Sequence, residues 1–441
     1  MTSDIDRLTQ IARKDPSLKF NSLMGMVFRP EGLRDSFGRL PGNKAPGVDK
    51  VRKDDYREGL DEKVQDLSER LRRMGYIPQP SRRVFIPKAN GGRRPLGIPA
   101  FEDRIVQDRL SQVLQAIYEP KFLDCSYGFR PGRSAHDALR KVAEIITMER
   151  TQYVVEADIK GFFDHVDHSW MVRFLEHRIN DERFMRTVQR FLKAGVIEDG
   201  AVRASEEGTP QGGLVSPCLA NVYLHYVLDL WFEKLFAFTC TGKARLVRYA
   251  DDFVACFSTR EDAERYLREL QERLGKFGLE VEPTKTRLIR FGSKASQRSY
   301  LDRLRRPETF SFLGFTHYVG KSRKGGFLVG RKTDRKRMSK KLKELNVKMA
   351  NLRLQGGKAM VTYAQQHLRG HVNYYAVSGN KEAVEDYYYN LSRVLHKWLN
   401  RRSLRKSLTW ARFNAIFVKG GLLPRPRLVH NLYNFPGFVP L

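Results

Sequence analysis

Cysteine is scarce in this 441-residue sequence, and long uninterrupted apolar runs are missing from it. None of the four cysteines stands in a C-x-x-C pair, which argues against a disulfide framework and against a Cys-paired zinc site. Polar and charged residues interrupt the most apolar stretch, residues 214–238, so we expect no membrane span. The first residues lack an apolar core and predict no signal peptide. A reducing, cytoplasmic location is therefore expected.

Acidic residues are also few relative to basic ones, with 50 Asp and Glu against 80 Lys and Arg and a net charge of +30. Such a surplus indicates a polyanionic partner, of which nucleic acid is the obvious kind. Residues 331–441 hold 23 basic and 5 acidic residues, and so carry more than half of the surplus. The hydrophobic fraction of 41% is sufficient for a packed core and excludes a disordered basic tail.

The chain length favours about two to four domains. Residues 4–79 are mostly helical in pattern, and a Gly91-Gly92 turn between residues 83–87 and 95–99 predicts a hairpin followed by a helix at 103–118. Apolar runs and helical periodicity then alternate: strands are expected at residues 153–159, 245–249 and 253–257, and helices at 170–178, 217–235 and 260–277.

This pattern predicts an α+β fold in four parts. These are a helical N-terminal extension at residues 1–79, a mixed region at 80–330, a basic helical region at 331–400 and a basic extension at 401–441. We place a boundary near Gly330. The last part contains two Arg-Pro steps and a Gly-Gly pair, and should be less regular.

Three carboxylates follow or separate the predicted strands. Asp251 and Asp252 lie between two apolar runs, where they either supply ordinary turn chemistry or face a cation at the edge of the core. Asp158 ends another apolar run. It either caps the end of a strand or serves as a metal ligand. Two-metal phosphoryl transfer needs carboxylates from separate strands that converge on two Mg²⁺ ions about 3.5–4 Å apart. Asp158 and Asp251 could supply them.

A glycine-rich loop, residues 208–217, lies between these carboxylates in the sequence. Its end predicts a helix with Ser216 as N-cap and Pro217 in the first turn. Gly212 and Gly213 permit close backbone approach to a ligand, and Gln211 could hydrogen-bond a base or sugar. The simpler interpretation is a turn that leads into a helix.

These segments, in this order, resemble the catalytic set of reverse transcriptases, specifically those encoded by group II introns. Further segments between Lys44 and Tyr375 share the family pattern: residues 44–49, 86–88 with 91–92, 94–99, 126–136, 312–315 and 368–375. The resemblance implies a right-hand polymerase. Residues 80–330 would form fingers and palm, residues 331–400 the thumb or maturase (X) domain, and residues 401–441 a nucleic-acid-binding extension.

The resemblance also implies roles at matching positions. Asp158, Asp251 and Asp252 would be catalytic, and together with Ile159 they would hold two Mg²⁺ ions. Lys285 matches a lysine proposed as general acid to the pyrophosphate, although Glu282 stands where the family more often has Asn.

Four residues match positions that contact the incoming dNTP. Lys88 and Arg94 would hold the triphosphate, since a polyanion needs fixed positive charge beside its metals. Phe163 matches the steric gate that excludes a 2′-hydroxyl, and Gln211 would contact the nucleotide. The alternatives are solvated surface charge for Lys88 and Arg94 and a core aromatic for Phe163.

A larger set of basic, glycine and tyrosine positions is expected to contact the template, the primer or a structured RNA. These are Arg82, Arg83, Gly212, Arg130, Arg133, Lys336, Arg337, Arg369, Tyr374, Arg401 and Arg402. The simpler interpretation of most of these charges is a solvated surface. Release of counterions would make their binding to a nucleic acid strongly salt dependent.

We therefore expect an RNA-directed DNA polymerase that uses Mg²⁺ and dNTPs and also acts as a maturase on intron RNA. Its partners would be an RNA template with its primer, a structured group II intron RNA and a DNA target, with the protein as a monomer or homodimer in the bacterial cytoplasm, near the nucleoid or in a ribonucleoprotein. The last cysteine is Cys256, so an HNH endonuclease with paired cysteines is not expected. The alternatives are a domesticated enzyme of the same chemistry in DNA repair or phage defence, and a non-catalytic RNA-binding splicing factor.

Overall fold

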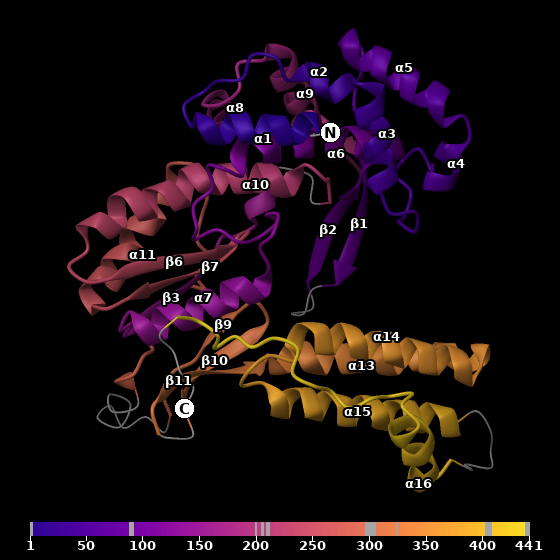
Figure 1. Ribbon diagram of the computed structural model, residues 1–441, viewed down its shortest axis with the longest axis vertical. Coiled ribbons are helices and arrows are strands. Elements are labelled where there is room, and N and C mark those ends of the chain that lie inside the picture. The colour runs from indigo at the N-terminus through magenta and orange to yellow at the C-terminus, as the bar shows by residue number, and fades with distance from the viewer. Residues whose placement is uncertain are drawn as a thin grey trace.

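The computed structural model describes residues 3–87, 92–198, 201–203, 207–208, 212–295, 306–322, 325–401 and 408–436. Along the longest axis, N-terminal helices lie at one end, a four-stranded sheet in the middle and basic helices at the other end (Figure 1). Helices combined with sheets of mostly antiparallel strands confirm the predicted α+β class. None of the described helices is long and apolar enough to cross a membrane.

Short amphipathic helices form the N-terminal end: α1 (Asp4–Lys14), α2 (Met24–Phe28), α3 (Pro30–Arg39), α4 (Lys53–Arg57), α5 (Leu60–Arg72), α8 (His168–Glu176) and α9 (Glu182–Lys193). Ser3 and Asp6 form a capping box that starts α1. These helices surround α6 (Phe101–Tyr118), which is buried along most of its length. Leu8 of α1 belongs to the same buried cluster as Phe253 of the central sheet. Residues 1–79 therefore share a core with the region that follows.

The predicted hairpin is confirmed as β1 (Ser81–Pro87) and β2 (Arg93–Ile98), which pair antiparallel with Val84 opposite Leu96. It belongs to a four-stranded sheet, in the order β2-β1-β4-β5, with β4 (Val196–Glu198) and β5 (Ala201–Arg203). The hairpin projects from the N-terminal helices toward the basic helices (Figure 1).

The central sheet is antiparallel and has the order β6-β7-β3-β8, with β6 (Ala244–Tyr249), β7 (Asp252–Phe257), β3 (Tyr153–Asp158) and β8 (Arg287–Arg290). Alternate residues of β7 enter different cores. Phe253 and Phe257 pack in the cluster shared with the N-terminal helices, whereas Val254 and Cys256 pack in a second cluster. Both faces of the sheet are thus covered, which explains why its strands are continuous apolar runs.

Helices cover the two faces of this sheet. On one side lie α10 (Ser216–Leu224), the π-helical turns His225–Asp229 and Phe232–Phe236, and α11 (Arg260–Gly275); α7 (Ala135–Met148) lies on the other side (Figure 1). The predicted cap of α10 was wrong by one residue. Val215 already has helical dihedrals and is the N-cap, so Ser216 is the first helical residue, although Pro217 does lie in the first turn.

A third sheet, of three strands, joins the central sheet to the basic helices. Its order is β11-β10-β9, with β9 (Phe310–Phe312), β10 (Phe315–Lys321) and β11 (Phe327–Thr333). Gly330 pairs with Tyr318 inside β11, so the boundary expected near Gly330 falls within a strand. The helical part begins after Asp334, whose carboxylate caps the next helix.

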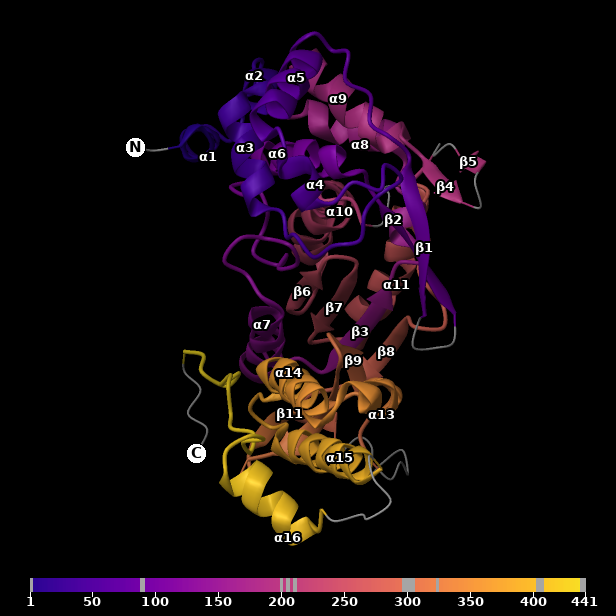
Figure 2. The ribbon, with the colours of Figure 1, turned by 90° about the vertical axis from the view of Figure 1, so that its right-hand side faces the viewer.

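The basic end of the molecule is a helical bundle of α13 (Arg335–Leu352), α14 (Gly357–Tyr375) and α15 (Lys381–Asn400) (Figure 2). It has its own core, which includes Leu345, Met360 and Leu391. The described residues after Asn400 contain α16 (Trp410–Phe413) and a π-helical turn, Asn414–Lys419, and then continue without regular structure to residue 436. A helical first half and a less regular second half were predicted, and both are confirmed for the described residues.

Candidate active site

The three predicted carboxylates lie at one edge of the central sheet. β6 and β7 form a hairpin in which Tyr249 pairs with Asp252, so Ala250 and Asp251 make a two-residue turn. Asp158, the last residue of β3, lies directly opposite Asp252, the first residue of β7. The register of the sheet therefore brings carboxylates together from sequence positions almost a hundred residues apart.

Crowding of these carboxylates opposes their ionisation. Burial, and then the charges of Asp158 and Asp251, raise the pKa of Asp252 to about 7. Burial raises the pKa of Asp251 as well, with a further contribution from Asp158. A site that holds several negative charges at such a cost favours a cation as its occupant.

Lys285 supplies one positive charge to this edge. Its ammonium group forms an ion pair with the Asp158 carboxylate. Partial burial opposes the charge of Lys285, but the bond to Asp158 raises its pKa above the ordinary value. The structure thus brings Lys285, one of the four predicted catalytic residues, to the predicted carboxylates.

The donor chemistry at this edge suits a hard divalent cation. Carboxylate oxygens are the ligands that Mg²⁺ prefers, and one of them, on Asp158, already binds a cationic group. Within the described residues, His, Cys, Asp and Glu side chains form no cluster of three or more in metal-binding geometry. Ile159, the fourth predicted metal position, is a buried residue that bridges to Val281.

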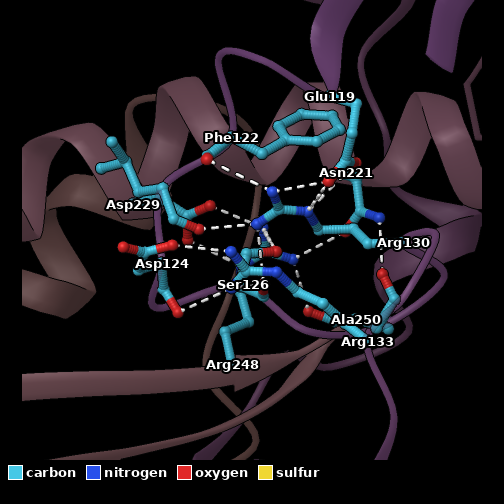
Figure 3. A network of polar contacts seen from close by, with 12 residues as sticks. Glu119, Phe122, Asp124, Ser126, Arg130, Arg133, Asn221, Asp229, Arg248 and Ala250 are labelled. Carbon is cyan, nitrogen blue, oxygen red and sulfur yellow. Dashed lines mark hydrogen bonds and ion pairs between the residues drawn. The ribbon is translucent and has the colours of Figure 1, made fainter. Parts of the chain in front are cut away.

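A buried polar network supports the turn between β6 and β7 (Figure 3). Arg248 and Asp229 have fully buried side chains and form a bidentate ion pair with distances of 2.7 and 2.6 Å. Burial opposes the charge of Arg248, yet the Asp229 carboxylate raises the pKa of Arg248. The same guanidinium donates to the carbonyl oxygen of Ala250 at 3.0 Å, so the ion pair is connected to the turn that carries Asp251.

Two further side chains complete this network. The guanidinium of Arg248 also donates to Asn221 Oδ1 at 3.0 Å and to Ser126 Oγ at 2.8 Å. Asn221 Nδ2 in turn donates to the Gly128 carbonyl oxygen at 2.7 Å. Helix α10, the loop at residues 125–130 and strand β6 are thereby joined behind the turn.

The backbone of the turn is unusual and closely packed. Ala250 has φ of 57°, in the left-handed region that costs non-glycine residues energy. A Cβ atom on Gly128 would lie 2.4 Å from the Ala250 amide nitrogen, so only glycine permits this approach. The strain at Ala250 is held by contacts on both sides.

Arg130 and Arg133, predicted to bind template or primer, make internal contacts in this structure. Arg130 has a buried side chain that binds Glu119 at 2.8 Å and the carbonyl oxygens of Leu123 and Ser126. Arg133 is partly buried and pairs with the exposed Asp124 at 2.6 Å (Figure 3). Both guanidinium groups fasten the loop behind the β6–β7 turn, and their contact with a nucleic acid stays a prediction.

The predicted nucleotide contacts are only partly described, because Lys88 and Gln211 lie outside the described residues. Arg94 is exposed on β2, and its positive charge acts on Asp251, partly opposing the effect of burial. Phe163 follows β3 in a short 3-10 turn and packs partly buried, with its ring centroid 5.2 Å from that of Phe162.

Gly212 links the glycine-rich loop to the hairpin. Its φ is 116°, and a Cβ atom at this position would lie 2.4 Å from the Gly97 carbonyl oxygen. The next described contact in the loop is from the Leu214 amide to Gln107 Oε1 of α6, at 2.7 Å. The role of this glycine in the structure is close packing against β2.

The other predicted RNA-binding residues differ in their surroundings. Arg82 donates to the Pro46 carbonyl oxygen at 2.7 Å, and Tyr374 donates to the Leu313 carbonyl oxygen at 2.8 Å, so both make internal contacts. Arg83 is partly buried. Exposed side chains on or beside the basic helices are those of Lys336, Arg337, Arg369 and Arg401. Arg402 lies outside the described residues.

Sequence reasoning missed the residues behind the turn: Arg248, Asp229, Asn221 and Ser126. One signal was present, because Arg248 is a charged residue inside the apolar run 246–249 and Asp229 interrupts the apolar stretch 214–238. Opposite charges in two otherwise apolar segments indicate a buried pair, since a buried charge requires a partner.

Comparisons with known proteins agree with this architecture. Residues 86–317 match the family described as reverse transcriptase (RNA-dependent DNA polymerase). The chain is 40% identical over 250 residues to Protein YkfC of Escherichia coli strain K12. This matched region covers 55% of this chain and 64% of that protein. It is 37% identical over 232 residues to the group II intron-encoded protein LtrA of Lactococcus lactis subsp. cremoris. This matched region covers 51% of this chain and 38% of LtrA.

The chain therefore belongs to the reverse transcriptase family. The predicted resemblance to group II intron-encoded proteins is confirmed. The match extends to a 91 kDa protein in the cob intron of Schizosaccharomyces pombe, 44% identical over 156 residues, 35% of this chain and 19% of that protein. In each of these relatives the matched part spans less than two thirds of the relative's length.

Proposed function

We propose that this protein is an RNA-directed DNA polymerase of the group II intron type, which extends a primer 3′-hydroxyl on an RNA template with dNTPs and releases pyrophosphate. The observation that carries the proposal is the register that places Asp158 opposite Asp252, beside the turn that holds Asp251. Membership of the reverse transcriptase family supports the same chemistry.

The carboxylates of Asp158, Asp251 and Asp252, with the carbonyl oxygen of Ile159, would hold two Mg²⁺ ions. When bound, such ions activate the attacking hydroxyl and stabilise the leaving group. Lys285, which pairs with Asp158 in this structure, would donate a proton to the departing pyrophosphate. Its present ion pair keeps it beside the carboxylate of Asp158, which would bind the metal.

The incoming dNTP would lie between the carboxylates and the β1–β2 hairpin. Arg94 and Lys88 would bind its phosphates, and Gln211 would hydrogen-bond its base or sugar. Phe163 would pack against the sugar and exclude a 2′-hydroxyl. In this assignment the hairpin belongs to the fingers, the central sheet is the palm and α13–α15 form the thumb or X domain.

A second activity, binding of a structured group II intron RNA, is favoured by the charge of residues 331–441 and by the likeness to an intron-encoded protein. Exposed Lys336, Arg337, Arg369 and Arg401 would contact phosphates of this RNA or of a DNA target. Such contacts would favour the folded, splicing-competent RNA.

Primer extension on an RNA template with dNTPs and Mg²⁺ tests the polymerase proposal. Asp251→Asn keeps the size of the side chain and should lower synthesis at least 100-fold, because a metal ligand is lost. Glu176→Gln, at an exposed position of α8, removes a charge outside the site and should leave synthesis unchanged. Equal synthesis by wild type and Asp251→Asn would contradict the proposal, and intron RNA binding measured on the same samples would show whether binding survives without synthesis.

A further inference from the structure

A large groove lies in the C-terminal part of the molecule, far along the chain from the catalytic edge. It has a volume of about 1810 Å³ and lies between α14, α15 and the segment of residues 410–429. This segment, yellow in Figure 1, passes along the helices of the bundle.

Specific hydrogen bonds fix both walls of the groove. From α14, the Gln365 side chain donates to the Leu422 carbonyl oxygen at 2.7 Å. From α15, the Tyr388 hydroxyl donates to the Leu423 carbonyl oxygen at 2.9 Å. His430 bonds the Asn373 carbonyl oxygen at 3.0 Å. The groove is therefore a preformed feature of the fold.

The charge of the lining has one sign. Five of its side chains are cationic and none is acidic; the cations are those of Arg369, Arg393, Lys419, Arg425 and Arg427. All five are exposed, and among the described residues none of them forms an ion pair with a carboxylate. A linear polyanion fits such a groove.

Two aromatic rings line the same groove. Tyr389 is 60% exposed and Trp410 is 43% exposed. His396 stacks on Trp410, with ring centroids 4.0 Å apart and planes at 12°, and so holds the indole in place. Exposed rings among cations bind unstacked bases, whereas the bases of a duplex have their faces covered.

We propose that this groove binds a single-stranded nucleic acid, with phosphates at the five cations and bases on Tyr389 and Trp410. This proposal rests on the proposed nucleic-acid-binding role of the C-terminal region and specifies the structural class of its ligand. RNA and DNA share the required phosphates and base faces, so the test includes both.

The test measures binding of fluorescent oligo(U) RNA and oligo(dT) DNA, each of about 12 nucleotides, to the full-length protein. The assay contains neither Mg²⁺ nor dNTPs. Arg393→Ala/Arg427→Ala should weaken binding about tenfold or more and reduce the slope of log K against log salt by about 1.4. Lys343→Ala/Lys348→Ala removes the same charge from exposed positions of α13, and should change the affinity less than about twofold.

The aromatic part of the proposal has its own variants. Tyr389→Ala should weaken binding about tenfold, because a stacking surface is lost, and Tyr389→Phe should bind like wild type. Far-UV circular dichroism and thermal unfolding show that each variant is folded. Tighter binding of RNA than of DNA would identify RNA as the ligand. Equal binding would show that the groove accepts single strands of either kind.

Three outcomes would overturn the proposal: unchanged binding by the groove variants, equal losses in the α13 control, or displacement of the oligonucleotide by duplex RNA or polyglutamate as readily as by unlabelled single strand. Because binding is measured without synthesis, a failed groove can be distinguished from a failed polymerase. A protein that binds single strands normally but never extends a primer would contradict the proposed function alone.

Discussion

Arg248 and Arg130, beside the β6–β7 turn, have buried side chains that bind carboxylates and backbone carbonyl oxygens. In the C-terminal bundle, by contrast, Arg369, Arg393 and Arg427 are exposed and line a groove without acidic residues. Desolvated arginines with fixed partners determine local geometry, and removing a partner leaves a buried charge. Solvated arginines contribute little to folding and remain available for a ligand. Arginine thus fixes the local geometry where it is buried, and remains available to bind a ligand where it is exposed.

The largest expected effect is at the buried pair. Arg248→Met should reduce the free energy of unfolding by about 3–5 kcal/mol, because Asp229 is left buried without a partner. Urea unfolding measures this change. Arg245→Met is a matched control on the same strand: Arg245 is half exposed, its pair with Glu149 lies near the surface, and the loss should stay below about 1 kcal/mol.

A double variant separates stability from positioning. Arg248→Met/Asp229→Leu removes both charges and should regain much of the lost stability. It still lacks the bond to the Ala250 carbonyl oxygen, so primer extension should stay low and need more Mg²⁺. Full recovery of synthesis together with stability would show that the network is structural only, and that Arg248 does not position the turn.

A smaller effect is expected at Asp252, whose pKa burial and the neighbouring carboxylates raise to about 7. The unfolded chain releases this proton near pH 4. Stability should therefore fall as pH rises from about 4 to 7, and the full penalty should be present above pH 7. Asp252→Asn should raise the free energy of unfolding by roughly 1–2 kcal/mol at pH 8 and by almost nothing at pH 4. An equal gain at both pH values, measured by urea unfolding, would contradict this assignment.

The same proton predicts how synthesis depends on pH. Mg²⁺ must displace it, so the Mg²⁺ concentration for half-maximal synthesis should rise as pH falls below about 7. Primer extension at several Mg²⁺ concentrations between pH 6 and 8 measures this dependence. An Mg²⁺ requirement that does not change over this range would show that Asp252 is already ionised or does not affect the metal.

The strands that carry the three carboxylates were predictable because their signals are local. Residues 153–158 and 252–257 are short apolar runs bounded by carboxylates, and the turn between β6 and β7 follows from adjacent Asp residues. The buried network was not predictable in the same way. Arg248 lies 19 residues from Asp229 and 122 from Ser126, so their contact depends on how α10 and the loop at 125–130 pack on the sheet.

The internal contacts of basic residues were not predictable for the same reason. Arg130 and Arg133 belong to a basic segment typical of phosphate binding, but the fold buries Arg130 against Glu119 and pairs Arg133 with the exposed Asp124. Burial depends on tertiary packing and has no local signature in a basic segment. The residues of the C-terminal groove form no sequence motif either, because the walls of the groove come from α14, α15 and the irregular segment after Asn400.

The smallest effect on stability is expected at Lys336, on the exposed surface of α13. Lys336→Gln should change the free energy of unfolding by less than about 0.5 kcal/mol, since it removes a solvated charge. If Lys336 contacts a phosphate of the intron RNA, the slope of log K against log salt should decrease by about 0.7–0.9. Urea unfolding and RNA titrations at several salt concentrations measure both quantities on one sample. A large loss of stability would show that Lys336 has a structural role, as the buried arginines do. An unchanged slope would show that Lys336 does not contact a phosphate of the RNA.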